Sequence, residues 1–352
     1  MREVEFINGA EAIARGALAA GCDFFAGYPI TPATPILLAM MQALPKVGGL
    51  AVEGEDEIAS IGMCIGAATA GRRAMTATSG PGISLYSENI GLALMAEVPL
   101  VIVDVQRMGP STGAATTVGQ GDVQFVRWGT GGGYPLIVLA PDSIESCYTL
   151  TQEAFALAER FRCPVILLTD KELNLTRATV SLPEAAPPPP RRPAPRFGEG
   201  EVVRITGSTH DEEGNITKDP AKVEALNRHL WEKIAAHRHE LERARLDLEE
   251  GAETLFVAFG TAARAMEEAV ALGRERGMHL ASATLHTLWP VPERTLRRAA
   301  QDVRRVVVAE LNPGLYVREV ERLLAPQGIE VRSLHRIDGK LIPPETFLEA
   351  AR

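Results

Sequence analysis

The run YPITP at residues 28–32 places a threonine between two prolines. It follows a strand-like apolar segment and proline fixes the backbone, so the hydroxyl of Thr31 would be held where that strand ends. Ligands of open α/β sheets bind at this carboxyl edge. The alternative is an ordinary strand-to-helix turn, with Thr31 as N-cap and Pro32 in the first helical position. The local pattern alone favours this alternative.

Four acidic residues stand at positions 53–57, immediately before the apolar, helix-like run IASIGMCIGAATAG. Acidic residues complement the positive end of a helix dipole, which accounts for one or two of the four. A buried carboxyl group at this place, with its pKa raised by desolvation, is able to donate a proton to a ring nitrogen. The pattern supports the two interpretations about equally.

Two further features end strands of the same predicted sheet. The run TSGPG at residues 78–82 has glycines that let backbone groups approach a ligand closely, although it is also an ordinary turn. Arg107 follows the apolar run PLVIVDVQ. Its guanidinium is suited to binding a carboxylate through two N–H groups, or to pairing with one of the many surface acids.

Several common catalytic signatures are missing from the sequence. It has no GxxxxGK[ST] phosphate loop, no GxSxG elbow and no HExxH helix. The 7 histidines are scattered, so no metal site is expected on this chain. The 4 cysteines lack the spacing of a zinc ribbon or a ferredoxin cluster, and we expect buried thiols.

Composition narrows the class of protein. A chain of 352 residues, 46% hydrophobic and 23% charged, is globular and long enough for two domains. A formal net charge of -9 argues against a nucleic-acid partner, because phosphate binding needs a basic face. The N-terminal run has no signal-peptide core, and no apolar run is long enough to cross a bilayer. We therefore expect a cytoplasmic protein without a membrane partner.

The pattern of elements indicates an α/β protein in three parts. Wholly apolar strands alternate with helices over residues 1–183, which is typical of a doubly wound parallel sheet covered on both faces. Residues 184–252 are predicted to hold a proline-rich linker at 184–196 and a highly charged helix at about 219–250. A second, smaller α/β domain is predicted for residues 253–352. The other predicted helices lie at about 8–20, 57–70, 83–96, 143–161, 262–276, 292–300 and 315–325.

At these motifs the sequence resembles a known family. GYPITPATP, EDEIASIGMCIGAATAG, TATSGPG and VQRMGPSTG followed by QGD are similar to the α subunit of 2-oxoacid:ferredoxin oxidoreductases, above all those acting on 2-oxoglutarate. The resemblance spans the chain and includes TGSTHDEEGN, TLWPVP and VVVAELNPG. It implies a first domain of the pyrimidine-binding type found in thiamine diphosphate enzymes. The second domain looks like a transketolase C-terminal domain.

The resemblance also implies roles for individual residues. In thiamine enzymes a glutamate opens a helix that reaches a glycine nine residues on, and Glu57 with Gly66 fits this spacing; Glu55 is the second choice. This glutamate contacts the aminopyrimidine nitrogen of the cofactor. Thr31 resembles the residue that contacts the 2-oxoacid, and Arg107 the one that engages its carboxylate. The cofactor-binding residues implied are Glu57, Tyr28, Pro29, Ile30, Ser79 and Gly80.

The family further implies that the chain works only with partners. No GDG…N motif for the diphosphate and Mg²⁺ occurs in a suitable place, so Mg²⁺ and a [4Fe-4S] cluster are expected on a β subunit. The family's reaction uses coenzyme A and ferredoxin with the 2-oxoacid. We expect an αβ heterodimer doubled to a heterotetramer, with a γ part either separate or missing. The polar segment 205–220 is expected to form an interface arm.

Alternatives stay open at this point. Pyruvate, branched-chain or aryl 2-oxoacids are rival substrates, since the sequence does not identify the residues that line the pocket. A non-catalytic scaffold subunit is a rival of another class, and the presence of Thr31, Glu57 and Arg107 together weighs against it. A free-standing small-molecule binding protein is a weaker third hypothesis.

Overall fold

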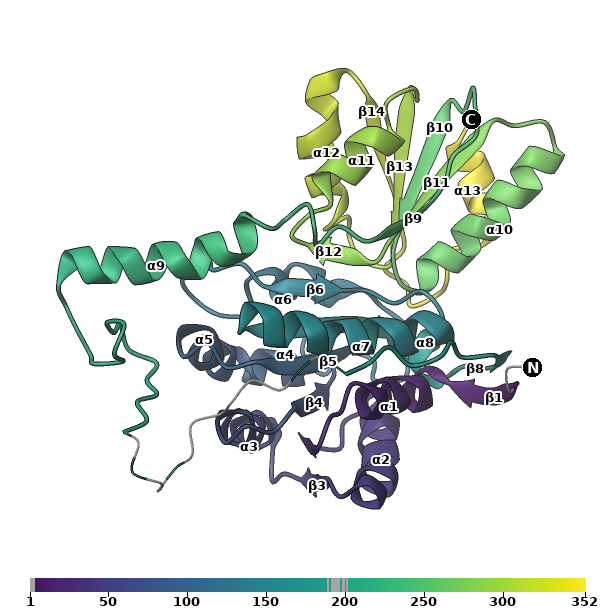
Figure 1. The fold of residues 1–352 in the computed structure, drawn as a ribbon. Coiled ribbons are helices and arrows are strands. Elements are labelled where there is room, and N and C mark those ends of the chain that lie inside the picture. Colours follow the sequence, from purple (N-terminus) through teal and green to yellow (C-terminus); the bar gives the residue numbers. More distant parts are fainter. Residues whose placement is uncertain (1–3, 189, 191–196, 198–199, 201) are drawn as a thin grey trace.

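Two α/β units make up the molecule, stacked one on the other (Figure 1). The computed structural model describes residues 4–188, 190, 197, 200 and 202–352, so most of the predicted linker at 184–196 lies outside the described residues. Within the described chain, no helix is long and apolar enough to cross a membrane.

The first unit is built on a seven-stranded sheet in the order β12-β6-β7-β5-β4-β2-β3. Every residue of β5 and β7 is buried, as expected for a parallel sheet with helices on both faces. The doubly wound prediction is therefore confirmed. The strands are β2 (Phe24–Gly27), β3 (Leu50–Glu53), β4 (Ala74–Thr78), β5 (Leu100–Gln106), β6 (Ile137–Leu139), β7 (Pro164–Asp170) and β12 (Thr287–Trp289), with a separate ribbon of β1 (Glu5–Asn8) and β8 (Arg177–Val180).

Local signals in the sequence set the starts of several helices. Asn8 and Glu11 form a capping box in which each side chain accepts a hydrogen bond from the other's backbone N–H, so the predicted helix at 8–20 is present as α1. The helix predicted at 83–96 is instead two helices, α4 and α5, broken at Tyr86. The helices of this unit are α1 (Gly9–Ala19), α2 (Thr34–Ala43), η1 (Leu44–Val47), α3 (Glu57–Thr69), α4 (Pro81–Leu85), α5 (Ser87–Met95), η2 (Gly121–Val123), α6 (Phe125–Trp128), α7 (Ile144–Phe161) and α8 (Lys171–Leu175).

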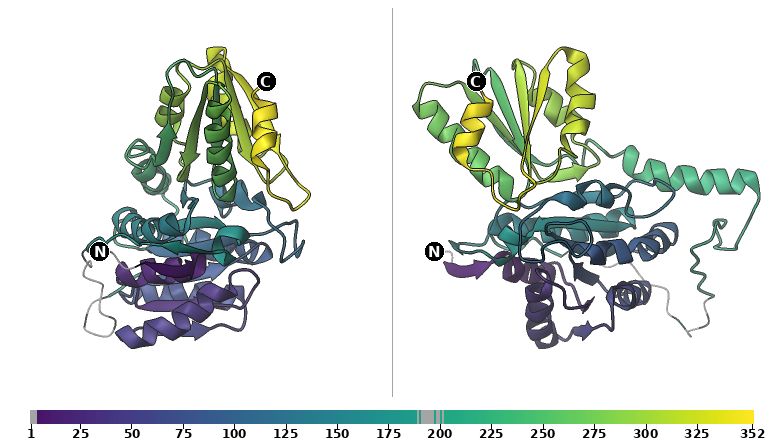
Figure 2. Two further views of the ribbon diagram at one scale, coloured as in Figure 1. Left: turned by 90° about the vertical axis from the view of Figure 1, so that its right-hand side faces the viewer. Right: turned by 180° about the vertical axis from the view of Figure 1, so that it is seen from behind.

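The second unit has a five-stranded sheet in the order β14-β13-β10-β11-β9, parallel except for β9. Its helices flank the sheet, as the two views of Figure 2 show. The elements are β9 (Ala244–Asp247), β10 (Thr254–Ala258), α10 (Thr261–Glu275), β11 (Leu280–Leu285), α11 (Glu293–Ala299), β13 (Arg305–Glu310), α12 (Val317–Leu324), η3 (Ala325–Gln327), β14 (Glu330–His335) and α13 (Pro344–Ala350).

The prediction of a charged helix at about 219–250 is wrong in the length of the helix, which is shorter than predicted. The observed helix α9 (Pro220–Ala235) stops fifteen residues early, and the chain then turns back to form edge strand β9. Leu241 in the turn is buried, and its carbonyl oxygen accepts a hydrogen bond from the hydroxyl of Thr287 at 2.6 Å. Tertiary pairing with β11 thus overrides the helix propensity of this charged segment.

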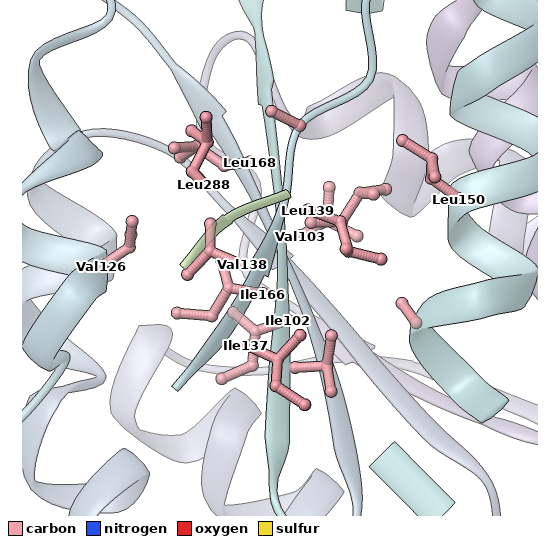
Figure 3. Close-up of a cluster of buried hydrophobic side chains, with 14 of the residues drawn as sticks. Ile102, Val103, Val126, Ile137, Val138, Leu139, Leu150, Ile166, Leu168 and Leu288 are labelled. Carbon is pink, nitrogen blue, oxygen red and sulfur yellow. The ribbon is translucent and has the colours of Figure 1, made fainter. Parts of the chain in front are cut away.

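The two units share a sheet edge. Strand β12 comes from between β11 and α11 of the second unit, yet it pairs antiparallel with β6 of the first. Leu288 of β12 joins the core around Val138 and Leu168 (Figure 3). The indole Nε1–H of Trp289 donates to the carbonyl oxygen of Val123 at 2.9 Å. The core is therefore continuous across the junction.

An ion cluster closes the junction on one side. The buried carboxylate of Asp142, just after β6, accepts from Arg245 at 2.5 Å and lies 2.9 Å from Nε2 of His286. The hydroxyl of Ser146 donates to the same carboxylate at 2.9 Å. Burial alone would raise the pKa of Asp142, but His286 and Arg245 outweigh it and hold the pKa well below the usual value.

Candidate active site

Three of the motifs singled out in the sequence meet at one edge of the large sheet. Strand β2 pairs in parallel with β4, and β4 pairs in parallel with β5, so their carboxyl ends are neighbours. The segments 28–32, 78–82 and 107 follow these three strands directly. The fourth motif, at 53–57, follows β3, which pairs with the other side of β2. This is the edge at which ligands of open α/β sheets bind.

Arg107 is buried and connects two of these loops. Its Nη1–H donates to the carbonyl oxygen of Thr31 at 2.5 Å, and its Nη2–H donates to the carbonyl oxygen of Thr112 at 3.1 Å. Its Nε is buried without a hydrogen-bond partner in the described chain. The guanidinium thus has a fixed orientation and retains donor capacity for a ligand.

The turn around Thr31 is not a helix cap. Helix α2 begins at Thr34 with Ala33 as N-cap, so the local alternative with Thr31 as N-cap is wrong. Thr31 itself is exposed. Asn174 fixes the turn from below, since its Nδ2 donates to the carbonyl oxygen of Pro32 at 2.8 Å. The Thr31 side chain therefore lies on a constrained loop and does not cap a helix.

The acidic residues at 53–57 differ in their structural environments. Asp56 is the N-cap of α3, and its side chain accepts from the backbone N–H of Ala59 at 2.6 Å. Glu57 is the first residue of α3 and is only 7% exposed, whereas Glu55 is exposed. Helix capping therefore accounts for Asp56 but leaves the burial of Glu57 without a structural explanation.

Gly82 brings Glu57 close to the loop after β4. A Cβ on Gly82 would lie 2.0 Å from Oγ1 of Thr78 and 3.0 Å from Oε1 of Glu57. Gly80 has φ of 53°, the left-handed region that favours glycine, and a Cβ there would lie 3.0 Å from Nε of Arg107. The two glycines allow the carboxyl group and the guanidinium to approach the same loop.

Unsatisfied polar atoms concentrate at this edge. Of the nine buried side-chain nitrogen and oxygen atoms without a hydrogen-bond partner in the described residues, six belong to residues at the ends of β4 and β5 or in the loop after β5. Buried polar groups in proteins are normally hydrogen-bonded, so such a cluster indicates a ligand site. The residues are Thr78, Ser79, Asp104, Arg107 and Asp122.

Two of these residues were missed from the sequence. Asp104 is the one charged residue inside the apolar run PLVIVDVQ, and a charge at a fully buried strand position was the available signal. Asp122 belongs to the QGD motif, which was noted only as part of the family pattern.

The surface beside Glu57 is apolar and open. Ile58 is 50% exposed and Leu85 is 46% exposed. Gly62 and Gly66 continue the exposed face of α3 at four-residue spacing, and a Cβ on either would meet nothing within 4 Å. A smooth apolar helix face next to a buried carboxyl group is typical of a surface that another protein covers.

The cysteines do not contribute to this edge. All four are buried and free, as predicted, and burial raises the pKa of the Cys64 and Cys163 thiols to about 12. Within the part of the chain that the structure describes, no group of three or more His, Cys, Asp or Glu side chains is arranged to hold a metal ion.

Comparison with known proteins shows the family of the chain. Residues 15–228 match the family described as pyruvate flavodoxin/ferredoxin oxidoreductase, thiamine diphosphate-binding. Residues 252–347 match core domain II of pyruvate:ferredoxin oxidoreductase. The chain therefore belongs to the 2-oxoacid:ferredoxin oxidoreductases, as the type of subunit that carries the thiamine diphosphate-binding domain.

Full-length relatives are similar along the whole chain. The chain is 43% identical to 2-oxoglutarate synthase subunit KorA of Methanocaldococcus jannaschii, over 99% of each chain. It is 40% identical to the subunit of the same name from Methanothermobacter marburgensis, over 99% of this chain and 98% of the relative. It is 36% identical to ketoisovalerate oxidoreductase subunit VorB of Methanothermobacter thermautotrophicus, over 99% of this chain and 97% of the relative.

Solved structures give the same fold. A 2-oxoglutarate:ferredoxin oxidoreductase from Magnetococcus marinus superposes with a TM-score of 0.91 at 30% identity, covering 99% of this chain and 65% of that one. That structure has 2-oxoglutarate, coenzyme A and succinyl-CoA bound. A split-gene transketolase superposes with a TM-score of 0.56 at 16% identity, covering 98% of this chain and 93% of that one. At this low identity the similarity shows a shared fold alone. The predicted family and fold are confirmed.

Proposed function

We propose that this chain is the α subunit of an enzyme that oxidatively decarboxylates 2-oxoglutarate, and that it supplies the pyrimidine side of an active site shared with a β subunit. Coenzyme A is the acyl acceptor and ferredoxin the electron acceptor. The substrate is supported by the names of the full-length relatives and by the ligands of the Magnetococcus marinus structure. The VorB relative makes a branched-chain 2-oxoacid the second candidate.

The observation that carries the proposal is the position of Glu57. Its carboxyl group is buried at the start of α3, beside loop 78–82 with its unsatisfied hydroxyl groups. Thiamine diphosphate supplies a nucleophilic carbon and a sink for electrons when it is bound. Glu57 holds a proton at the aminopyrimidine nitrogen, and the residues of this chain proposed to line that ring are Tyr28, Pro29, Ile30, Ser79 and Gly80.

The substrate end of the site is proposed to lie between Arg107 and Thr31. The guanidinium attracts and orients the carboxylate of the 2-oxoacid, because an arginine with fixed geometry binds carboxylates well. The hydroxyl of Thr31, held on its proline-flanked loop, contacts the oxygen atoms next to the reacting carbon. Together the two residues position the substrate and do not themselves exchange electrons.

The rest of the chemistry is assigned to the partner. The four cysteines of this chain are buried and far apart in the sequence, and their thiols are poor ligands when protonated. We therefore assign the [4Fe-4S] cluster, Mg²⁺ and diphosphate binding to the β subunit. The exposed face of α3, with Ile58, Gly62 and Gly66, is the surface that the partner is proposed to cover.

A second contact region is proposed at residues 205–220, in an αβ heterodimer doubled to a heterotetramer. The segment forms a compact polar turn in which Asp211 pairs with Lys222 of α9 at 3.1 Å. Ile205 and Ile216 remain 43% and 66% exposed. A hollow of about 850 Å³ separates the turn from the end of α5. The arm projects with α9 from one side of the molecule (Figure 1).

The test is reconstitution. Reduction of a viologen dye that depends on 2-oxoacid, coenzyme A and thiamine diphosphate is measured with this chain alone, with the β subunit alone and with the two co-expressed. Activity only in the pair, highest with 2-oxoglutarate among 2-oxoglutarate, pyruvate and 2-oxoisovalerate, is expected. Activity of the isolated chain overturns the shared site. A cofactor- and cluster-loaded pair that is inactive with all three acids favours a scaffold subunit.

A further inference from the structure

The turn that carries Thr31 is fixed in its backbone and open at its side chain. The carbonyl oxygen of Ile30 accepts hydrogen bonds from the backbone N–H groups of Ala33 and Thr34 at 2.7 and 2.9 Å. The Thr31 side chain is exposed. A fixed backbone with an accessible hydroxyl is the arrangement expected of a residue that contacts a ligand.

Two buried side chains bind the next two carbonyl groups of this turn. Nη1 of Arg107 donates to the carbonyl oxygen of Thr31 at 2.5 Å, and Nδ2 of Asn174 donates to that of Pro32 at 2.8 Å. Arg107 follows the end of β5, whereas Asn174 belongs to α8, which follows β7. The peptide groups on both sides of Pro32 are therefore held by side chains from two other segments of the chain.

A contribution to stability does not explain why an amide occupies position 174. The Asn174 side chain is fully buried, yet its Oδ1 has no hydrogen-bond partner in the described chain. The Pro32 carbonyl oxygen only accepts, so it is Nδ2 that must face it and Oδ1 that is left over. A buried oxygen without a partner costs free energy, and an apolar side chain of the same shape would avoid that cost. The amide is therefore better explained by the loop that its N–H group holds.

The backbone around Asn174 has little freedom to move. A Cβ on Gly9, at the start of α1, would lie 2.3 Å from the carbonyl oxygen of Leu173 and 3.1 Å from Cα of Asn174. Helices α1 and α8 thus touch backbone to backbone at this point. The amide of Asn174 therefore reaches Pro32 from a fixed position.

Asp170 joins the start of α8 to the second unit. Its Oδ1 accepts from the backbone N–H of Leu173 at 3.1 Å, and its Oδ2 accepts from the N–H of Thr261, the first residue of α10, at 2.8 Å. A Cβ on Gly260 would lie 2.7 Å from the same Oδ2, so the second unit comes this close because the residue is glycine. One buried carboxylate therefore binds the first turns of two helices, one from each unit.

We propose that Asn174 is a positioning residue for the 2-oxoacid, which sets the place of the Thr31 hydroxyl by holding the carbonyl group of Pro32. Asp170 makes this placement depend on the second unit, because it binds the start of α8 and the start of α10 at once. The second unit thereby has an indirect part in substrate binding. The inference rests on the proposed contact between Thr31 and the substrate.

The kinetic test is a double-mutant cycle in the complete αβ enzyme. kcat and KM for 2-oxoglutarate are measured for the wild type, Asn174→Leu, Thr31→Val and the double variant. Leucine keeps the branched shape of asparagine and lacks its N–H groups. Asn174→Leu is expected to lower kcat/KM about tenfold in the wild-type background, because the hydroxyl is misplaced. In the Thr31→Val background, which has no hydroxyl to place, it is expected to change kcat/KM by less than about twofold.

Two further variants accompany the cycle. Asp170→Asn keeps one acceptor for two N–H groups, so it is expected to follow the same pattern with a smaller loss, between about twofold and tenfold. Leu175→Ala, at the next position of α8 and exposed, is expected to leave both constants unchanged. Equal losses from Asn174→Leu in the two backgrounds, or no loss in either, would overturn the proposal. Wild-type kinetics in Asp170→Asn would overturn the part assigned to the second unit.

Hydrogen exchange of the full chain gives a readout that needs no activity. The backbone N–H groups of Ala33 and Thr34, which close the turn, are expected to exchange about tenfold faster in Asn174→Leu and in the smaller Asn174→Ala, and at the wild-type rate in Leu175→Ala. Faster exchange without any 2-oxoacid activity in the assembled pair means that the proposed function fails while the loop is held as inferred. Unchanged exchange in both Asn174 variants overturns the inference. Failure of both variants to fold overturns it too, because the amide would then serve the stability of the chain.

Discussion

The guanidinium of Arg107 donates a hydrogen bond from Nη1 to the carbonyl oxygen of Thr31, 76 positions earlier in the chain, at 2.5 Å. The two residues assigned to the 2-oxoacid are thus directly joined. A substitution at Arg107 is therefore expected to affect both the guanidinium proposed to bind the substrate carboxylate and the loop that carries the Thr31 hydroxyl.

Arg107→Lys is expected to raise KM for the 2-oxoacid roughly 10- to 100-fold in the αβ enzyme. Lysine keeps the positive charge but is unable to form the bidentate hydrogen bonds that a guanidinium makes with a carboxylate. Steady-state kinetics measures the change. Thr31→Val is the matched variant, since it removes the hydroxyl and keeps the carbonyl oxygen that Arg107 binds. An unchanged KM in Arg107→Lys would mean that the substrate carboxylate binds elsewhere.

Glu57→Gln is expected to lower turnover by about 10²- to 10⁴-fold, since a neutral amide of the same shape is unable to serve as the acid–base group. Glu55→Gln, two residues away and exposed, is expected to leave turnover near the wild-type value. Both variants are assayed in the assembled enzyme after gel filtration shows that the subunits remain associated. Wild-type turnover in Glu57→Gln would support the scaffold interpretation.

Gly82→Ala is expected to destabilise the chain by about 1–3 kcal/mol, because the new methyl group would collide with Thr78 and press on Glu57. Thermal unfolding of the isolated chain measures this change. A wild-type melting temperature would show that loop 78–82 moves aside more readily than its packing indicates.

Gly62→Ala tests the open face of α3. Nothing lies within 4 Å of the added methyl group. Because alanine is a better helix former than glycine, the free energy of unfolding of the isolated chain is expected to rise by about 0.5–1 kcal/mol. Association with the β subunit is expected to weaken, because the methyl group would project from the face that the partner is proposed to cover. Unfolding and sedimentation experiments separate the two effects, and unaltered association would place the partner on a different surface.

Asp142→Asn is expected to lower the free energy of unfolding at neutral pH by roughly 1.5–3 kcal/mol, since it removes charged hydrogen bonds with Arg245 and His286. The folded pKa of Asp142 lies below its usual value, so the stabilisation is present above about pH 4 and lost as the pH falls further. Denaturant titrations from neutral to acidic pH should show a shallower acid decline in the variant. Parallel curves would contradict this role.

The sequence was sufficient to predict which motifs share an edge. Parallel apolar strands must align their carboxyl ends, so the loops at 28–32, 78–82 and 107 were expected at the same edge of the sheet. That the strands before them are direct neighbours depends on the strand order, which the sequence did not predict. The contact between Arg107 and the Thr31 backbone was not predictable, because it depends on loop conformations that no local pattern determines. Asp104 escaped notice for a different reason, since an acid in a strand ordinarily marks a solvent-facing position.

The errors in the second half arose from long-range pairing. A run of charged, helix-favouring residues after Ala235 becomes a turn and an edge strand because β11 offers a pairing partner. Strand β12 has only three residues next to a proline, too few for a periodic pattern, and its partner lies about 150 positions earlier in the chain.

Because β12 completes the edge of the large sheet, the first unit is not a self-contained fragment when the chain is truncated between the two units. A truncated version ending before the second unit would leave the backbone N–H and C=O groups of β6 uncovered, along with the apolar surface that Leu288 and Trp289 occupy. Such a bare strand is a template for indiscriminate self-association. A biotechnologist seeking a minimal thiamine-binding fragment would therefore need to graft Thr287–Trp289 back onto it or redesign β6.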